Sequence, residues 1–158
     1  MGLTIKMETH SDLSQMSFCG IVQHHEAKQQ VADPTKILAK FAWTPLVYAE
    51  AGPKTLRMLN VCKALSYAHA YPHLPVVRPF MNYVLRVTQG KIVHHDYLRH
   101  LNEYERINFM RALEAHNSYR VPKFEPLMQT RLLVEKLYKV SVDQQLAAEQ
   151  YLDGLSEL

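Results

Sequence analysis

The sequence is poor in glycine and cysteine. Its 158 residues include five glycines, which is too few for collagen-like or flexible-linker character and leaves little room for a glycine-rich phosphate loop or a dinucleotide-binding fingerprint. Cys19 and Cys62 form no CxxC pair, and two cysteines make no disulfide framework. A reducing compartment is therefore expected.

The sequence also lacks a long apolar run. No stretch of about 18 uncharged apolar residues is present, so no membrane-spanning helix is predicted. The most apolar tract, residues 38–51, is interrupted by Lys40, Pro45 and Glu50. The apolar fraction of 47% and the charged fraction of 21% are typical of a globular protein. This length suits one domain, covering residues 1–158.

The charge is unevenly distributed, although the net charge is only +3. Residues 1–77 carry seven basic and five acidic side chains, residues 78–124 carry eight and four, and residues 125–158 carry three and six. The basic middle suits an acidic protein partner, anionic lipid headgroups or RNA about equally well. Charge alone does not choose among these partners.

Capping residues and prolines divide the sequence into expected helices. Ser11 is expected to cap a first helix through residues 13–22, and Asp33-Pro34 to open a short helix that ends near Ala42. An amphipathic helix is predicted from Lys54 to about Ala70, followed by an extended connector over residues 71–75. The apolar stripe of that helix consists of Met58, Val61, Cys62, Leu65 and Ala68.

Further helices are expected in the second half of the chain. Pro79 opens a helix that Gly90 stops, and Asp96 caps a short helix holding Leu98 and Leu101. The next helix runs from about Glu103 to His116, and Glu125-Pro126 opens another. Because no alternating pattern lasts longer than about four residues, any sheet is expected to be minor. The predicted class is all-α, an irregular helical domain with proline-rich extended connectors rather than a regular bundle.

The acidic C-terminal segment, residues 141–158, is expected to be a final helix. Ser141 and Gln144 have the spacing of a capping box, and Gly154 closes the helix. We expect this helix to pack antiparallel on the helix containing residues 133–138. Its inward residues are expected to be Leu146 or Ala147, Tyr151 and Leu155. Its outward residues are expected to be Asp143, Glu149 and Asp153.

The candidate chemistry is weak. The adjacent pairs His24-His25 and His94-His95 would point about 100° apart on a helix, and Pro72 separates His69 from His73, so no metal site is expected. Cys62 lies on an apolar stripe, which favours core packing over a reactive thiolate. Without a paired nucleophile and base, the sequence predicts neither an enzyme nor a bound cofactor.

Nucleic-acid binding is a further alternative. Tyrosines, including Tyr104, alternate with arginines in the basic stretch and could stack on bases. Arg99 and Arg106 are expected to share a helix face, with Arg111 well around the axis from them. Because no continuous basic stripe results, nucleic acid is the less favoured partner.

The basic stretch carries four short motifs that resemble a known family. They are Tyr97-Leu98-Arg99-His100-Leu101, Tyr104-Glu105-Arg106, Arg111-Ala112-Leu113 and Val121-Pro122-Lys123. Together they resemble the 14 kDa subunit (subunit 7) family of the mitochondrial cytochrome bc1 complex. The resemblance covers residues 78–140, and residues 1–77 form an N-terminal extension without a counterpart.

The resemblance implies a non-catalytic accessory subunit of a respiratory complex. Such a subunit would lie peripherally on the matrix side of the mitochondrial inner membrane, beside a cytochrome b-like subunit, with anionic lipid as a further contact. The alternative is a soluble, cytoplasmic helical adaptor or regulator that binds nucleic acid or an acidic protein. The expected partner-binding residues are Trp43, Arg86, Arg99, Tyr104, Arg106, Arg111 and Lys123. The expected apolar anchors in the connectors are Trp43, Leu46, Tyr48, Leu74, Val76 and Val77.

Overall fold

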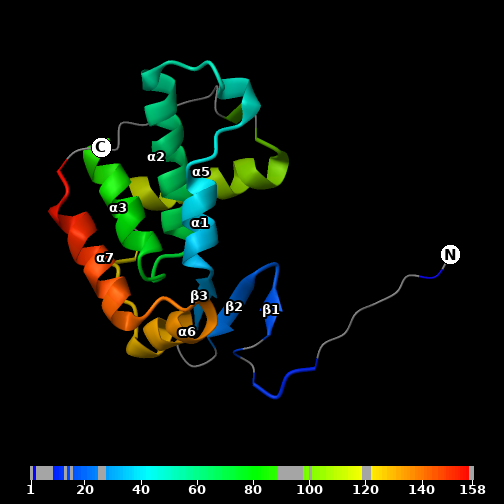
Figure 1. Cartoon of the computed structure of the whole chain (residues 1–158). Coiled ribbons are helices and arrows are strands. Elements are labelled where there is room, and N and C mark those ends of the chain that lie inside the picture. The colour runs from blue at the N-terminus through cyan, green and yellow to red at the C-terminus, as the bar shows by residue number, and fades with distance from the viewer. Residues whose placement is uncertain are drawn as a thin grey trace.

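Helices dominate the structure, as the sequence predicts. The computed structural model describes residues 2, 9–12, 14, 16–24, 28–88, 98–99, 101–118 and 122–156. Within these residues the helices, shown in Figure 1, are α1 (Pro34–Phe41), α2 (Pro53–Ala70), α3 (Val77–Val87), α5 (Glu103–Asn117), α6 (Met128–Tyr138) and α7 (Val142–Gly154), with a short 3-10 helix, η2 (Leu46–Tyr48). The predicted all-α class is therefore confirmed, with one small sheet added.

That sheet replaces the first predicted helix. Strands β1 (Ser17–Phe18), β2 (Ile21–His24) and β3 (Gln29–Ala32) pair antiparallel in sequence order. Phe18 pairs with Ile21, so Cys19 and Gly20 form a two-residue turn in which both φ angles are positive, at 53° and 78°. This backbone joins strands with their natural twist, and glycine adopts it without steric cost. The prediction of a helix over residues 13–22 is wrong, because Gly20 marks a turn rather than a weak point in a helix.

Two helices begin at the predicted caps. The Asp33 carboxylate accepts hydrogen bonds from the backbone N–H groups of Thr35 (3.0 Å) and Lys36 (3.3 Å), and Pro34 follows at the first helical position. The Ser141 hydroxyl accepts from the N–H of Gln144 at 3.2 Å, and the Gln144 side chain accepts from the N–H of Ser141 at 2.9 Å. The capping box of α7 is therefore confirmed in both directions.

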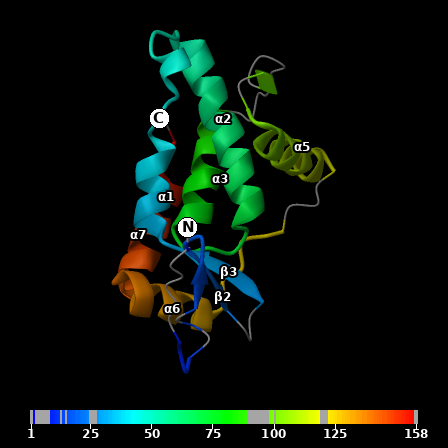
Figure 2. The same cartoon turned by 90° about the vertical axis from the view of Figure 1, so that its right-hand side faces the viewer.

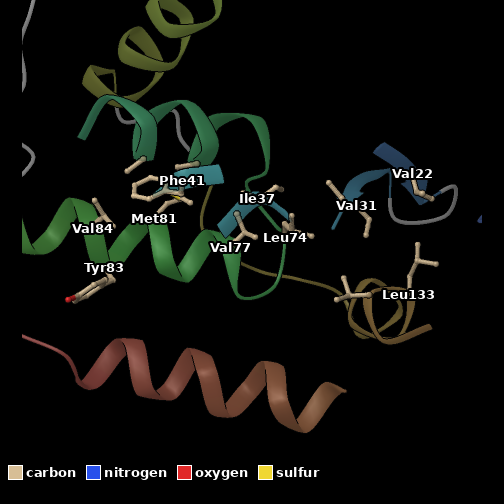
Figure 3. Packing of buried hydrophobic residues seen from close by; sticks show 14 residues of the cluster. Val22, Val31, Ile37, Phe41, Leu74, Val77, Met81, Tyr83, Val84 and Leu133 are labelled. Atoms are coloured by element: carbon tan, nitrogen blue, oxygen red, sulfur yellow. The ribbon is translucent and has the colours of Figure 1, made fainter. Parts of the chain in front are cut away.

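Helix α2 lies at the centre of the packing and is buried on two sides. Ala64 and Ala68 face the larger core, which includes residues of β2, β3, α1, α3 and α6. Figure 3 shows the side chains of this core, with Phe41 of α1 beside Met81 of α3. The other side of α2 packs Val61, Cys62 and Leu65 against Phe109 of α5. The predicted stripe on this helix is buried, with Met58 at its edge.

The remaining helices surround α2 and α3, which lie side by side. Helix α7 runs along α3, and α6 lies across the end of α7 near the sheet (Figure 1). Helix α5 packs chiefly on α2 and stands out from the rest of the helices in Figure 2. The described chain is thus an irregular helical arrangement with one outlying helix.

Three predicted boundaries need correction. The connector between α2 and α3 consists of tight turns rather than extended chain, with the N–H of Val77 donating to the carbonyl of Pro75 at 2.7 Å. Helix α3 begins at Val77, two residues before Pro79. Helix α6 begins at Met128 rather than at Glu125-Pro126. The expected stop at Gly90 and cap at Asp96 lie outside the described residues.

The segment before α6 is held by contacts with an earlier part of the chain. It lies against the junction of α2 and α3, where Arg78 donates to the carbonyl of Pro122 at 3.4 Å and His73 accepts from the N–H of Glu125 at 3.4 Å. These contacts fix residues 122–125 in place before α6 begins.

The inward face of α7 differs from the predicted one. Gln145 and Glu149 are buried, whereas Leu146 and Tyr151 are exposed. Leu152 and Leu155 pack against the core at its edge, so only Leu155 of the predicted inward set lies there. Glu149, predicted to face outward, instead binds the buried Arg131 of α6. A polar pair overrides the hydrophobic pattern in this helix, and α7 packs on α3 as well as on α6.

Candidate partner-binding surfaces

Helix α5 has a well-defined start and one buried face. The Asn102 side chain accepts from the N–H of Glu105 at 2.9 Å, and the Glu105 carboxylate accepts from the N–H of Asn102 at 3.2 Å. Phe109 and Ala112 are the buried residues of the helix. Residues three positions apart share a helix face, so Phe109 and Ala112 mark the face that packs on α2. The opposite face of α5 therefore points away from α2.

The outward face of α5 carries exposed apolar side chains. Tyr104 is 76% exposed, Met110 47% and Ile107 46%. Their spacing relative to Phe109 and Ala112 could have identified Ile107 and Met110 from the sequence, although only Tyr104 was predicted. A shallow groove of about 590 Å³ runs along this face, and its lining includes Ile107, Met110 and Leu113.

Two of the predicted arginines border this apolar strip. Arg106 and Arg111 are exposed and also line the groove. At about 100° per residue they lie about 140° apart around the axis, with Ile107 and Met110 between them. Glu103 and Glu114 are exposed on the same side of the helix. This outward face, called the α5 face below, is therefore an apolar strip with charges of both signs.

Arg99 and Lys123 lie on either side of α5 in the sequence. Arg99 is exposed in a short helical segment, and Lys123 is exposed in the chain that leads to α6. Helical structure is interrupted at Leu101-Asn102, before α5 starts. The prediction that Arg99 and Arg106 share one helix face is therefore wrong.

Arg86 is bound within the molecule. Its guanidinium donates to the carbonyls of Leu152 (2.8 Å) and Leu155 (2.8 Å), and more weakly to that of Asp153 (3.5 Å). The guanidinium also lies 5.8 Å from the centre of the Tyr83 ring. In Figure 3 the Tyr83 side chain points from α3 toward α7. Arg86 therefore caps the end of α7, where carbonyls lack helical partners.

Trp43 lies in a second exposed apolar surface, at the turn between α1 and α2. Trp43 is 76% exposed, Leu46 89% and Val47 59%. The other predicted anchors differ in burial. Leu74 and Val77 are fully buried in the core, and Tyr48 and Val76 are half-buried. The prediction that Leu74 and Val77 anchor a partner is therefore wrong, because both side chains are buried in the protein's own core.

A cleft of about 620 Å³ with a mixed polar and apolar lining lies between α2, α5 and the sheet. Tyr67, Tyr71 and Tyr104 line it, and burial raises the pKa of Tyr67 and of Tyr71 above the usual range. Both phenols are therefore neutral at physiological pH. Lys63 also lines the cleft, but its ammonium group already donates to the carbonyls of Phe41 and Trp43. The cleft presents stacking surface and hydrogen-bonding groups rather than an activated nucleophile.

The described cysteine and histidine side chains do not form a reactive or metal-binding cluster. Cys62 is fully buried, and burial raises its pKa to about 12, whereas Cys19 is exposed in the hairpin turn. Within the described residues no three His, Cys, Asp or Glu side chains are placed to hold a metal ion. His25, His94 and His95 lie outside those residues. None of the described helices is both long and apolar enough to cross a membrane.

Comparison with known proteins adds no relative from which a function could be transferred. No family model matches the chain, and neither a curated protein nor a solved structure matches it significantly.

Proposed function

We propose that this protein is a non-catalytic accessory subunit that docks onto another protein through the α5 face. The observation that carries the proposal is the exposed strip of Ile107 and Met110 between Arg106 and Arg111, with Tyr104 at the edge of the face, where it also lines the cleft. Interface centres are enriched in Tyr, Met and Arg, and a helix laid along a partner commonly uses anchors at this spacing.

The charges on the α5 face favour a protein partner over a nucleic acid. Glu103 and Glu114 lie on the same side as Arg106 and Arg111. Carboxylates repel a phosphate backbone, whereas a protein surface can place cations opposite them. The partner is therefore a protein surface with an apolar strip and charges of both signs.

The complex in which this docking occurs is, in our proposal, the mitochondrial cytochrome bc1 complex. The support is the set of motifs around Leu98-Arg99, Tyr104-Glu105-Arg106 and Arg111-Ala112-Leu113, which includes the α5 face. The chain would bind a cytochrome b-like subunit from the matrix side of the inner membrane. It would contribute contacts rather than a redox group.

Native electrophoresis of detergent-solubilised mitochondrial membranes tests both statements. We expect the tagged chain to migrate with the haem absorbance of cytochrome b. Arg106→Glu combined with Arg111→Glu should release it, because the reversed charges oppose the partner surface. The control is Lys28→Glu with Lys139→Glu, which reverses two exposed cations away from the α5 face.

The outcomes separate the two statements. Migration of the wild-type chain without cytochrome b would disprove the assignment to the bc1 complex. Equal migration of the two double variants with the complex would disprove docking through the α5 face. If assembly were unaffected and only the arginine variant lost retention on RNA at low salt, the adaptor function would be the correct one.

A further inference from the structure

The turn between α1 and α2 forms a second surface whose chemistry differs from that of the α5 face. It contains Trp43, Leu46 and Val47, and all three side chains are more than half exposed. Figures 1 and 2 show this turn at one end of the molecule. We call residues 40–57 the tip.

Hydrogen bonds hold the backbone of the tip in a defined turn. The N–H of Tyr48 donates to the carbonyl of Pro45 at 2.9 Å, and the N–H of Ala51 to that of Tyr48 at 3.0 Å. The Lys63 ammonium donates to the carbonyls of Phe41 and Trp43, which fixes the chain where it leaves α1. Its apolar side chains are thus held outward before any partner is bound, which lowers the entropic cost of binding.

The tip also carries exposed cations. Lys40 in the last turn of α1, and Lys54 and Arg57 in the first turns of α2, are exposed. Over residues 40–57 the sequence contains these three cations and a single acidic side chain, Glu50. Unlike the α5 face, the tip therefore combines apolar side chains with charge of predominantly one sign.

We propose that the tip inserts Trp43, Leu46 and Val47 into the interfacial layer of an anionic phospholipid bilayer. Tryptophan favours the headgroup level of a membrane, where its ring is buried and its N–H stays hydrated. Lys40, Lys54 and Arg57 would meet the lipid phosphates around it. This membrane contact goes beyond protein docking through the α5 face and does not depend on it.

The size and charge of the tip favour a bilayer over a second protein. The apolar surface rests on a few side chains of one short turn, whereas a stable protein interface buries about 800 Å² on each partner. A bilayer accepts a small apolar projection of any outline, and its anionic surface complements a cationic rim.

Trp43 is the only tryptophan, so its fluorescence reports on the tip directly. With vesicles of phosphatidylcholine containing about one third phosphatidylglycerol, we expect a blue shift and quenching by brominated acyl chains. Pure phosphatidylcholine vesicles should give a much smaller effect, and about 0.5 M salt should weaken binding to the anionic vesicles.

Two variants of the tip dissect the contact, and one variant elsewhere is the control. Lys40→Gln with Lys54→Gln should weaken vesicle binding about fivefold for each cation removed. Leu46→Ser with Val47→Ser should reduce the blue shift although the charge is unchanged. Tyr104→Ser with Ile107→Ser removes exposed apolar groups from the α5 face and should leave the Trp43 signal as in the wild type.

The proposal is overturned if anionic vesicles leave the Trp43 emission unchanged, or if the α5 variant abolishes the shift as completely as the tip variants. A shift produced only by a purified protein complex, and not by vesicles, would make the tip a protein-docking surface instead. Neither result affects the test of docking through the α5 face, because that test measures whether the chain migrates with a complex.

Discussion

Glu149 of α7 accepts two hydrogen bonds from the guanidinium of Arg131 on α6, at 2.9 and 2.7 Å. One of its oxygens also accepts from the N–H of Val76 at 3.0 Å. Val76 has a φ of 65° and a ψ of −47° at the centre of a γ-turn between Pro75 and Val77, a conformation that is unfavourable for a β-branched residue. This buried pair therefore joins α6, α7 and the start of α3, and it holds a strained residue in place.

Breaking this pair on one side should be costly. Glu149→Gln leaves the buried Arg131 without a negative partner, so we expect the free energy of unfolding to fall by about 3 kcal/mol. Urea denaturation followed by circular dichroism measures the change. Asp153→Asn, an exposed carboxylate on the same helix, should change it by less than about 0.5 kcal/mol.

Replacing both partners should cost less than replacing one. Arg131→Met with Glu149→Leu removes both charges together, so we expect it to be more stable than Glu149→Gln alone. A double variant that is as unstable as the sum of its two single variants would show that the two side chains do not interact.

Arg86 should stabilise the protein itself rather than a complex. Arg86→Met keeps the aliphatic stem but leaves the carbonyls of Leu152 and Leu155 without their donor, so we expect a loss of about 1–2 kcal/mol. Hydrogen exchange should accelerate in the last turn of α7. Arg111→Met, at an exposed position, should leave both measurements near the wild type; the opposite ranking would contradict the intramolecular role of Arg86.

The cap of α7 gives a smaller and separate effect. Ser141→Ala removes the acceptor for the N–H of Gln144 and should lower the stability by about 1 kcal/mol. Thermal unfolding measures it, with Ser156→Ala, beyond the end of the helix, as the control. An unchanged melting temperature in Ser141→Ala would show that the capping box contributes nothing to stability.

The two thiols should differ in reactivity. In the native protein an aromatic disulfide reagent should modify the exposed Cys19 only, and Cys19→Ser should react only after unfolding, because Cys62 is buried. Rapid modification of Cys62 in folded Cys19→Ser would contradict its burial.

Cys62 also gives a pH dependence. Burial raises the pKa of Cys62 to about 12, whereas a thiol in the unfolded chain has a pKa of about 8.5. Above the pKa of the unfolded thiol, the unfolded state loses a proton that the folded state keeps. The contribution of Cys62 to stability therefore falls as the pH rises from the unfolded pKa to the folded pKa. Below the unfolded pKa, Cys62 contributes no pH dependence. In Cys62→Val the alkaline decline in stability should be smaller than in the wild type.

Local signals in the sequence predicted the fold best. The caps at Asp33 and Ser141 need only neighbouring residues, and both are present as predicted. The apolar stripe of α2 was also readable, because its spacing follows one helix. The hairpin at Cys19-Gly20 was not predicted, because the apolar residues of the segment 13–22 also fit helical spacing.

Long-range polar contacts could not be predicted in this way. Hydrophobic periodicity assigned Glu149 to solvent, since it does not reveal that Arg131 lies opposite. Arg86 and Arg106 look alike in the sequence and both are exposed. Arg86 nevertheless binds carbonyls at the end of α7, whereas Arg106 donates to the carbonyl of Leu101 beside its own helix, at 3.5 Å. A cation near a helix end can serve its own fold or a partner, and only the tertiary arrangement distinguishes the two.

The contact between Val76 and Glu149 has a consequence for the order in which the protein is made. Seventy-three positions separate these residues, so the start of α3 leaves the ribosome well before its carboxylate partner exists. Arg86 likewise waits for the carbonyl of Leu155, 69 positions later. The nascent chain must therefore hold α2 and α3 in an incomplete state during synthesis, with exposed apolar surface of the kind that chaperones bind. Both contacts can form only after α7 and Leu155 have emerged from the ribosome.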